Sequence, residues 1–170
     1  MGRPPFVSAR GFRYVRTMVS LRFSCQPGCT NCCQVRGYVY LTEADLEKAA
    51  GFLKLSARQF EKRYVYRTRH LLRLRKPEGS QCHFLLPNGC AIHPAKPTQC
   101  RLFPFWPELV EDRRAWEGAR RGCPGIGMGR LIQIGTALEI ADEMRRAYPA
   151  TYDGARAAKA VVTPREVSRT

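Results

Sequence analysis

Eight cysteines in 170 residues constrain this chain more than any other feature of its sequence. Four of them lie in the nine-residue segment CQPGCTNCC at 25–33, and the last two are adjacent. Adjacent cysteines do not suit an ordinary disulfide, because consecutive Cα atoms lie only ~3.8 Å apart. The first twenty residues also lack the apolar run of a secretory signal. The sequence therefore favours metal binding in a reducing compartment over a disulfide framework.

The cysteines have the spacing of metal ligands. The pattern C-x3-C-x2-C-C contains the turn formers Pro27, Gly28 and Asn31, which bring thiolates together at a small entropic cost. Thiolate sulfur suits both zinc and iron–sulfur clusters, so the spacing does not decide the metal. Eight thiols are enough for two four-thiolate sites, or for one site together with reactive thiols. The candidate ligands are Cys25, Cys29, Cys32, Cys33, Cys82, Cys90, Cys100 and Cys123.

Three segments predict short strands. The segment VRGYVYL at 35–41 is rich in β-branched and aromatic residues, and residues 69–80 pass from a strand into a Pro/Gly turn. The segment CHFLLPNGCAIH at 82–93 predicts a hairpin with an Asn-Gly turn. Cys82 and Cys90 would then flank the turn on either side, in a geometry that can share one metal.

Helix signals separate these strands. Thr42 is expected to cap a helix over 43–50, and Ser56 begins the capping box S-x-x-Q of a second helix that runs toward Val65. The prolines between 94 and 107 exclude a long helix there. The sequence thus predicts two short, well-capped helices before the hairpin and irregular chain after it.

The C-terminal half is predicted to end in the longest helix. Residues 113–121 are expected to form a polar connector or an edge strand, and CPGIGMG at 123–129 a glycine-rich loop that positions Cys123. Residues 130–148 show the apolar spacing of one buried helix face. The residues expected on that face are Leu131, Ile134, Leu138, Ala141 and Tyr148.

Some residues beside the cysteines have two interpretations. His83 and His93 adjoin Cys82 and Cys90, but we expect them to be partly exposed hairpin residues rather than ligands. The guanidinium of Arg101 could donate hydrogen bonds to cluster sulfurs, or it could lie on the surface. Three aromatic residues are expected to pack beside the site and keep water out: Phe103, Phe105 and Trp106.

Together these elements predict a small α+β fold. We expect a single domain stapled by metal, with short strands and a hairpin, long cysteine-bearing loops and a C-terminal helix. This cysteine-cluster domain is expected to span 21–148, between a flexible basic N-terminal tail (1–20) and a flexible basic C-terminal tail (149–170). The start at Met1 or at Met18 stays open.

The charge of the chain permits an anionic partner without requiring one. Net charge is +15, from 29 basic and 14 acidic residues, which would suit nucleic acid. The basic residues are spread along the whole chain, and the cysteines lack the C-x2-C pairs of a zinc ribbon. No apolar run reaches the ~20 residues that cross a bilayer. We therefore expect a cytoplasmic protein without a membrane partner, and leave an unidentified protein partner open.

The cysteine pattern resembles the YkgJ-type cysteine-cluster family, a zinc- or iron-chelating domain. The likeness rests on CQPGCTNCC (25–33), on CHFLLPNGCAIHPAKPTQCRLFPFWPE (82–108) and on the last cysteine in GCPGIGMG (122–129). It covers roughly residues 22–130. Two dipeptides depart from the family's usual Ile-Tyr and Arg-Pro: they are Ile92-His93 and Lys96-Pro97.

The resemblance implies that all eight cysteines chelate metal. A similar module occurs in flagellin lysine N-methylases, where it is associated with an iron–sulfur cluster. This favours an iron–sulfur cluster, of the 4Fe-4S type, over zinc. The chain is shorter than those methylases, so their activity is not carried over. The role implied is that of a structural staple, with a redox or protein-modification accessory function as an extension.

Three alternatives stay open at this point. The first is a radical-SAM-like or methylase-related enzyme. The spacing C-x3-C-x2-C also occurs in radical S-adenosylmethionine enzymes, although 170 residues are too few for their barrel and Cys33 offers a fourth ligand. A zinc-dependent nucleic-acid-binding module is the second alternative. In the third, a metal-delivery or redox-switch protein, Cys33 would be a spare reactive thiol. Whether the chain is an enzyme is left undecided.

Overall fold

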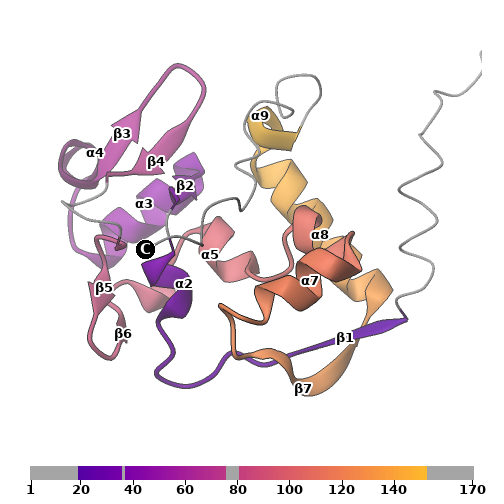
Figure 1. Ribbon diagram of the computed structural model, residues 1–170. Helices are drawn as coiled ribbons and strands as arrows, with labels where there is room; N and C mark the ends of the chain where they lie inside the picture. The colour runs from indigo at the N-terminus through magenta and orange to yellow at the C-terminus, as the bar shows by residue number, and fades with distance from the viewer. Residues whose placement is uncertain (1–18, 36, 76–80, 153–170) are drawn as a thin grey trace, which may run out of the picture.

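The computed structural model describes residues 19–35, 37–75 and 81–152, and shows an α+β fold as expected from the sequence (Figure 1). Nearly all of both predicted tails lies outside these residues. Within the described ranges, no helix is both long and apolar enough to cross a membrane.

The first half of the chain forms a small lobe of two helices and one three-stranded antiparallel sheet, ordered β2-β4-β3. Capping boxes start both helices: Thr42 pairs with Asp45, and Ser56 with Gln59. Phe60 is fully buried against the sheet residues Val65 and Leu74. The elements are β2 (Tyr40–Leu41), α3 (Glu43–Phe52), α4 (Ala57–Tyr64), β3 (Val65–Arg67) and β4 (Leu72–Leu74).

Short cysteine-bearing elements lie beside this lobe. The predicted Asn-Gly hairpin is present, with Leu86 paired to Gly89 and Leu85 to Cys90. As expected from the prolines, no long helix follows between 94 and 107. The elements are α2 (Asn31–Gln34), β5 (Leu85–Leu86), β6 (Gly89–Cys90), the 3₁₀ turn η1 (His93–Ala95) and α5 (Thr98–Leu102).

The second half and the N-terminal strand at 20–23 form another lobe, in which an antiparallel ribbon of two strands packs against helices. Its core gathers Leu21, Phe105, Trp116, Ile126 and Ala137. Figure 1 shows α5 between the two lobes. The elements are β1 (Ser20–Phe23), α6 (Pro107–Val110), α7 (Arg113–Ala119), β7 (Ile126–Gln133), α8 (Ile134–Ala147) and α9 (Pro149–Tyr152).

Three predictions for this half were wrong. Residues 113–119 form helix α7 rather than a connector or edge strand, because Asp112 caps them by accepting from two backbone N–H groups. Much of the expected glycine loop belongs to strand β7, which pairs with β1. The long helix begins at Ile134 rather than at 130, so Leu131 lies in the strand, 57% exposed, and not on a buried helix face.

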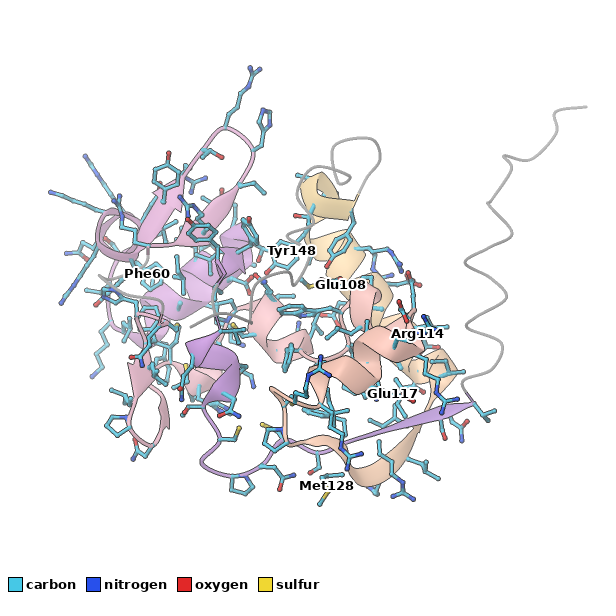
Figure 2. All side chains as sticks on the ribbon, in the orientation of Figure 1. Phe60, Glu108, Arg114, Glu117, Met128 and Tyr148 are labelled. Carbon is cyan, nitrogen blue, oxygen red and sulfur yellow. The ribbon has the colours of Figure 1, made fainter. Side chains whose placement is uncertain are left out.

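One buried polar network joins the lobes. Asp45 on α3 is 6% exposed, and its carboxylate accepts from Thr98 at the start of α5 through both N–H (2.9 Å) and hydroxyl (2.8 Å). Tyr148, which follows α8, lies 3.2 Å from the same carboxylate through its hydroxyl and accepts from the N–H of Gln99. In Figure 2 Tyr148 lies where α8 approaches the first lobe. The network therefore fixes α5, and with it Cys100, between the two lobes.

Candidate metal centre

The segment with four cysteines is wound by its own backbone. The N–H of Cys29 donates to the carbonyl of Gln26 (3.1 Å), and Gly28 takes a φ of +73°, which a side chain would disfavour. The N–H of Cys33 then donates to the carbonyl of Thr30 (2.9 Å) at the start of α2. This winding presents Cys32 and Cys33 together on one short helical turn.

The hairpin is fastened to that turn. The N–H of Cys82 donates to the carbonyl of Cys33 (2.9 Å), and the two side chains are also hydrogen-bonded. Within the hairpin, Cys90 pairs with Leu85, three residues after Cys82. The hairpin and the four-cysteine segment, far apart in the sequence, are thereby joined.

Five cysteines form what we call the first cysteine group: Cys32, Cys33, Cys82, Cys90 and Cys100. Hydrogen bonds with Cys32 and Cys82 raise the pKa of Cys33. The hydrogen bond from Cys33 and the nearby charge of Lys96 lower the pKa of Cys32 to about 6. The lowered pKa favours the thiolate form of Cys32, which is the form that binds metal.

Two members of the group are held in the neutral thiol form. Burial raises the pKa of Cys90, and the nearby Cys82 adds to the rise. Burial raises the pKa of Cys100 to about 12, with further contributions from Cys82, Cys32 and Cys90. These mutual effects place Cys100 with the hairpin cysteines, because charges influence each other's ionisation only at short range.

The other three cysteines, Cys25, Cys29 and Cys123, form the second cysteine group. Burial raises the pKa of Cys123, and Cys29 and Cys25 raise it further. The backbone brings them together: the N–H of Ser24 donates to the carbonyl of Gly125 (3.1 Å). A Cβ on Gly125 would lie 2.5 Å from that serine's carbonyl oxygen, so the close approach requires glycine.

All eight cysteines are free thiols. Among the described residues, no three His, Cys, Asp or Glu side chains converge in a geometry that holds a metal ion. The fold brings the cysteines into two neighbourhoods, and turning of the thiols about their Cα–Cβ bonds would have to complete a site. Soft thiolate donors of this kind fit zinc or an iron–sulfur cluster, and not a hard cation such as Mg²⁺.

The structure shows where the histidines and the arginine beside the cysteines lie. His83 and His93 are exposed, and His93 lies 3.5 Å from the Nζ of Lys96. Arg101 is also exposed and pairs with Glu143 at 2.6 Å, as the surface interpretation requires. Phe105 packs in the core cluster that Cys123 joins. Sequence reasoning missed Lys96 as the cation beside Cys32; its place three residues after His93 in the hairpin segment was the available signal.

Comparison with known families identifies the family of the cysteine-bearing domain. A family model described as "CxxCxxCC: Putative zinc- or iron-chelating domain" matches residues 24–124. The chain belongs to this family. The matched range contains all eight cysteines, and thus both cysteine groups. No solved structure matches the chain. A zinc- or iron-chelating domain is the function that the CxxCxxCC family supports for it.

Metal binding at the first cysteine group should release fewer protons than its number of thiols. At pH 7 we expect fewer than four protons for a four-thiolate site that includes Cys32, because the lowered pKa of that thiol leaves it partly ionised before the metal binds. Affinity should rise with pH, because the metal displaces the protons that remain. Calorimetric titration with Zn²⁺ in two buffers of different ionisation enthalpy measures the release. A release of four protons would contradict the ionised state of Cys32.

Proposed function

We propose that this protein holds an iron–sulfur cluster, of the 4Fe-4S type, at its first cysteine group, with zinc as the alternative metal. The observation that carries the proposal is the double link between Cys33 and Cys82, through backbone and side chain, which joins the four-cysteine segment to the hairpin. Four thiols from two separate segments would supply the ligands once their side chains turn toward one metal: Cys32, Cys33, Cys82 and Cys90.

The surroundings of this group suit a bound cluster. A cluster held by four thiolates carries negative charge, and Lys96 supplies a nearby positive charge. Ile92, 1% exposed, and Phe84, 6% exposed, follow Cys90 and Cys82 closely and shield one side of the hairpin from water. A cluster would supply one-electron chemistry when bound. The protein's part would be to hold it, set its exposure and balance its charge.

Cys100 is proposed as a reserve or alternative ligand of the same group. It sits on α5, whose position the buried Asp45–Thr98 contact fixes, so it does not depend on the hairpin for its place. The second cysteine group would bind a separate metal or act as a set of reactive thiols. This division assigns every cysteine of the predicted ligand set to one of two neighbourhoods.

A reducing compartment such as the cytoplasm is proposed as the location, since both groups must keep their thiols reduced to bind metal. The bound centre would serve as a structural staple between hairpin and α2. A redox or protein-modification accessory role, with a protein partner, extends the proposal.

Anaerobic purification followed by analysis of iron, acid-labile sulfide and zinc tests the proposal. Cys82→Ser should remove the metal of the first group, because it takes away the ligand that links two segments. Cys123→Ser, the matched control in the second group, should leave that metal in place. Each variant is checked for folding by circular dichroism.

Each result of the metal and sulfide analysis supports or overturns a stated part of the proposal. Iron with sulfide in the wild type, lost in Cys82→Ser and kept in Cys123→Ser, supports the cluster at the first group. Zinc alone, with no sulfide, overturns the cluster but keeps the site. Equal loss from both variants overturns the division into two groups. A folded wild type without metal, even after reconstitution under reducing conditions, overturns the function itself.

A further inference from the structure

A basic segment lies away from the cysteines, at the end of α4 and along the β3–β4 hairpin. Residues 62–75 contain no aspartate or glutamate. In Figure 1 the β3–β4 hairpin projects from the edge of the first lobe. All lysines and arginines of the segment 62–75 except Arg73 are exposed: Lys62, Arg63, Arg67, Arg69 and Arg75.

Most of this positive charge is not neutralised by acidic side chains. Arg67 pairs with Glu61 and with Glu43. Within the described part of the chain, no ion pair reaches the other basic residues of the segment. Arg75 instead donates to the backbone carbonyl of Val65 (2.8 Å). The hairpin therefore presents a positive surface that an anionic partner can neutralise.

Aromatic rings flank an arginine on the outward face of the same sheet. The Cζ of Arg73 lies 3.8 Å from the ring centroid of Tyr38 and 4.7 Å from that of Tyr66. Tyr66 is paired with Arg73 across β3 and β4. The two rings remain 48% and 45% exposed. We call these three residues the Tyr–Arg–Tyr platform.

The platform faces outward because the strands alternate. Val65, Leu72 and Leu74 are the inward residues of β3 and β4, and all three are buried in the core of the first lobe. Tyr66 and Arg73 occupy the opposite face of the pleat. Two half-exposed tyrosines on an otherwise solvated face are not required by the core, since the inward residues already supply it.

We propose that the β3–β4 hairpin binds single-stranded nucleic acid. Exposed aromatic rings on a sheet provide stacking surfaces for unpaired bases, and surrounding arginines contact the phosphates. The guanidinium of Arg73 lies over both rings and places a positive charge directly beside the stacking surface. Arg69, at the end of the β3–β4 hairpin, would contact the phosphates of the bound nucleic acid.

Charge and aromatic surface together favour this ligand over other polyanions. An acidic peptide or a duplex would use the arginines but would not stack on the exposed surface of the two tyrosines, because a peptide has no bases and paired bases are not available for stacking. The proposed site contains no cysteine, so the proposal does not depend on which metal the protein holds.

The test is fluorescence anisotropy of the full-length, metal-loaded protein with a fluorescein-labelled oligo(dT) of about 20 nucleotides, at 50 and 200 mM salt. Tyr38→Ala/Tyr66→Ala should weaken binding at least about fivefold for each stacked base lost. Tyr38→Phe/Tyr66→Phe keeps the rings and should bind like the wild type. Arg69→Ala should reduce the slope of log K against log salt by ~0.7.

Arg130→Ala is the matched charge control. It removes one exposed arginine from β7 in the other lobe and should change the affinity less than twofold. Equal affinity for a duplex of the same length, or for polyglutamate, would overturn the proposal in favour of a duplex or an acidic protein partner. Absence of binding at 50 mM salt, or an alanine pair that binds as tightly as the phenylalanine pair, would also overturn it.

Discussion

Asp45→Ala is expected to lower the free energy of unfolding by about 3–5 kcal/mol, because several hydrogen bonds lose one charged acceptor. Asp45 is the one charged side chain that is buried in the described part of the chain. Its carboxylate accepts from the N–H of Thr42 (2.9 Å) and from both the N–H and the hydroxyl of Thr98. Removing it leaves these partly buried donors without their acceptor.

Chemical denaturation with urea, followed by circular dichroism, measures the change. Glu47→Ala is the control, because this exposed glutamate lies on the same helix and should cost no more than about 0.5 kcal/mol. Tyr148→Phe removes only the hydroxyl at 3.2 Å and should cost about 1–2 kcal/mol. A loss below 1 kcal/mol in Asp45→Ala would contradict the role of this network in joining the lobes.

The same variant should affect the metal centre. The carboxylate of Asp45 positions Thr98, which begins α5 two residues before Cys100. If α5 loses this contact, Cys100 is no longer held beside the hairpin cysteines. Asp45→Ala should therefore lose metal to a chelator faster than Glu47→Ala does. None of the hydrogen bonds of Asp45 given above is to a cysteine, so the effect would be indirect.

The sequence predicted the elements whose signals are local. Thr42 and Ser56 form the expected capping boxes, and the Asn-Gly dipeptide makes the expected hairpin turn. Each of these depends on interactions between residues a few positions apart, so no knowledge of the tertiary fold was needed. The family resemblance was also correct, because cysteine spacing is visible in the sequence itself.

The errors arose where the partner is distant. The glycines of CPGIGMG predict a loop, but Gly127 and Gly129 lie in β7 with φ values of +89° and +78°. A Cβ on Gly129 would lie 2.6 Å from the Cβ of Ser24, so glycine permits β1 to approach. That requirement comes from a strand about a hundred residues earlier, and local sequence could not reveal it. Leu131 was misassigned for the same reason.

The division of the cysteines was likewise invisible in the sequence. C-x3-C-x2-C-C looks like one unit, yet Cys25 and Cys29 influence Cys123, whereas Cys32 and Cys33 interact with each other and with the hairpin. The split follows from the link between Ser24 and Gly125 and from the link between Cys33 and Cys82. Long-range hydrogen bonds, rather than spacing, decide which thiols are neighbours.

Phe60→Ala is expected to destabilise the protein by about 3–5 kcal/mol, because it empties the centre of the first lobe. Phe60 lies within the first lobe (Figure 2) and is fully buried. Its ring centroid lies 5.2 Å from that of Tyr64 and 6.2 Å from that of Phe84. The melting temperature should fall by roughly 6–20 °C in a chain of this size. Phe52→Ala on α3, at a position 46% exposed, is the matched control and should change it little.

The consequence reaches the metal through Phe84. This residue lies two positions after Cys82, and its carbonyl accepts from the N–H of Ala91, beside Cys90. The stacked Phe60 ring is therefore part of what holds the two hairpin cysteines in place. At a temperature where both variants remain folded, Phe60→Ala should transfer its metal to a chromogenic chelator several times faster than Phe52→Ala. Equal transfer rates would show that the hairpin keeps its geometry without the core of the first lobe.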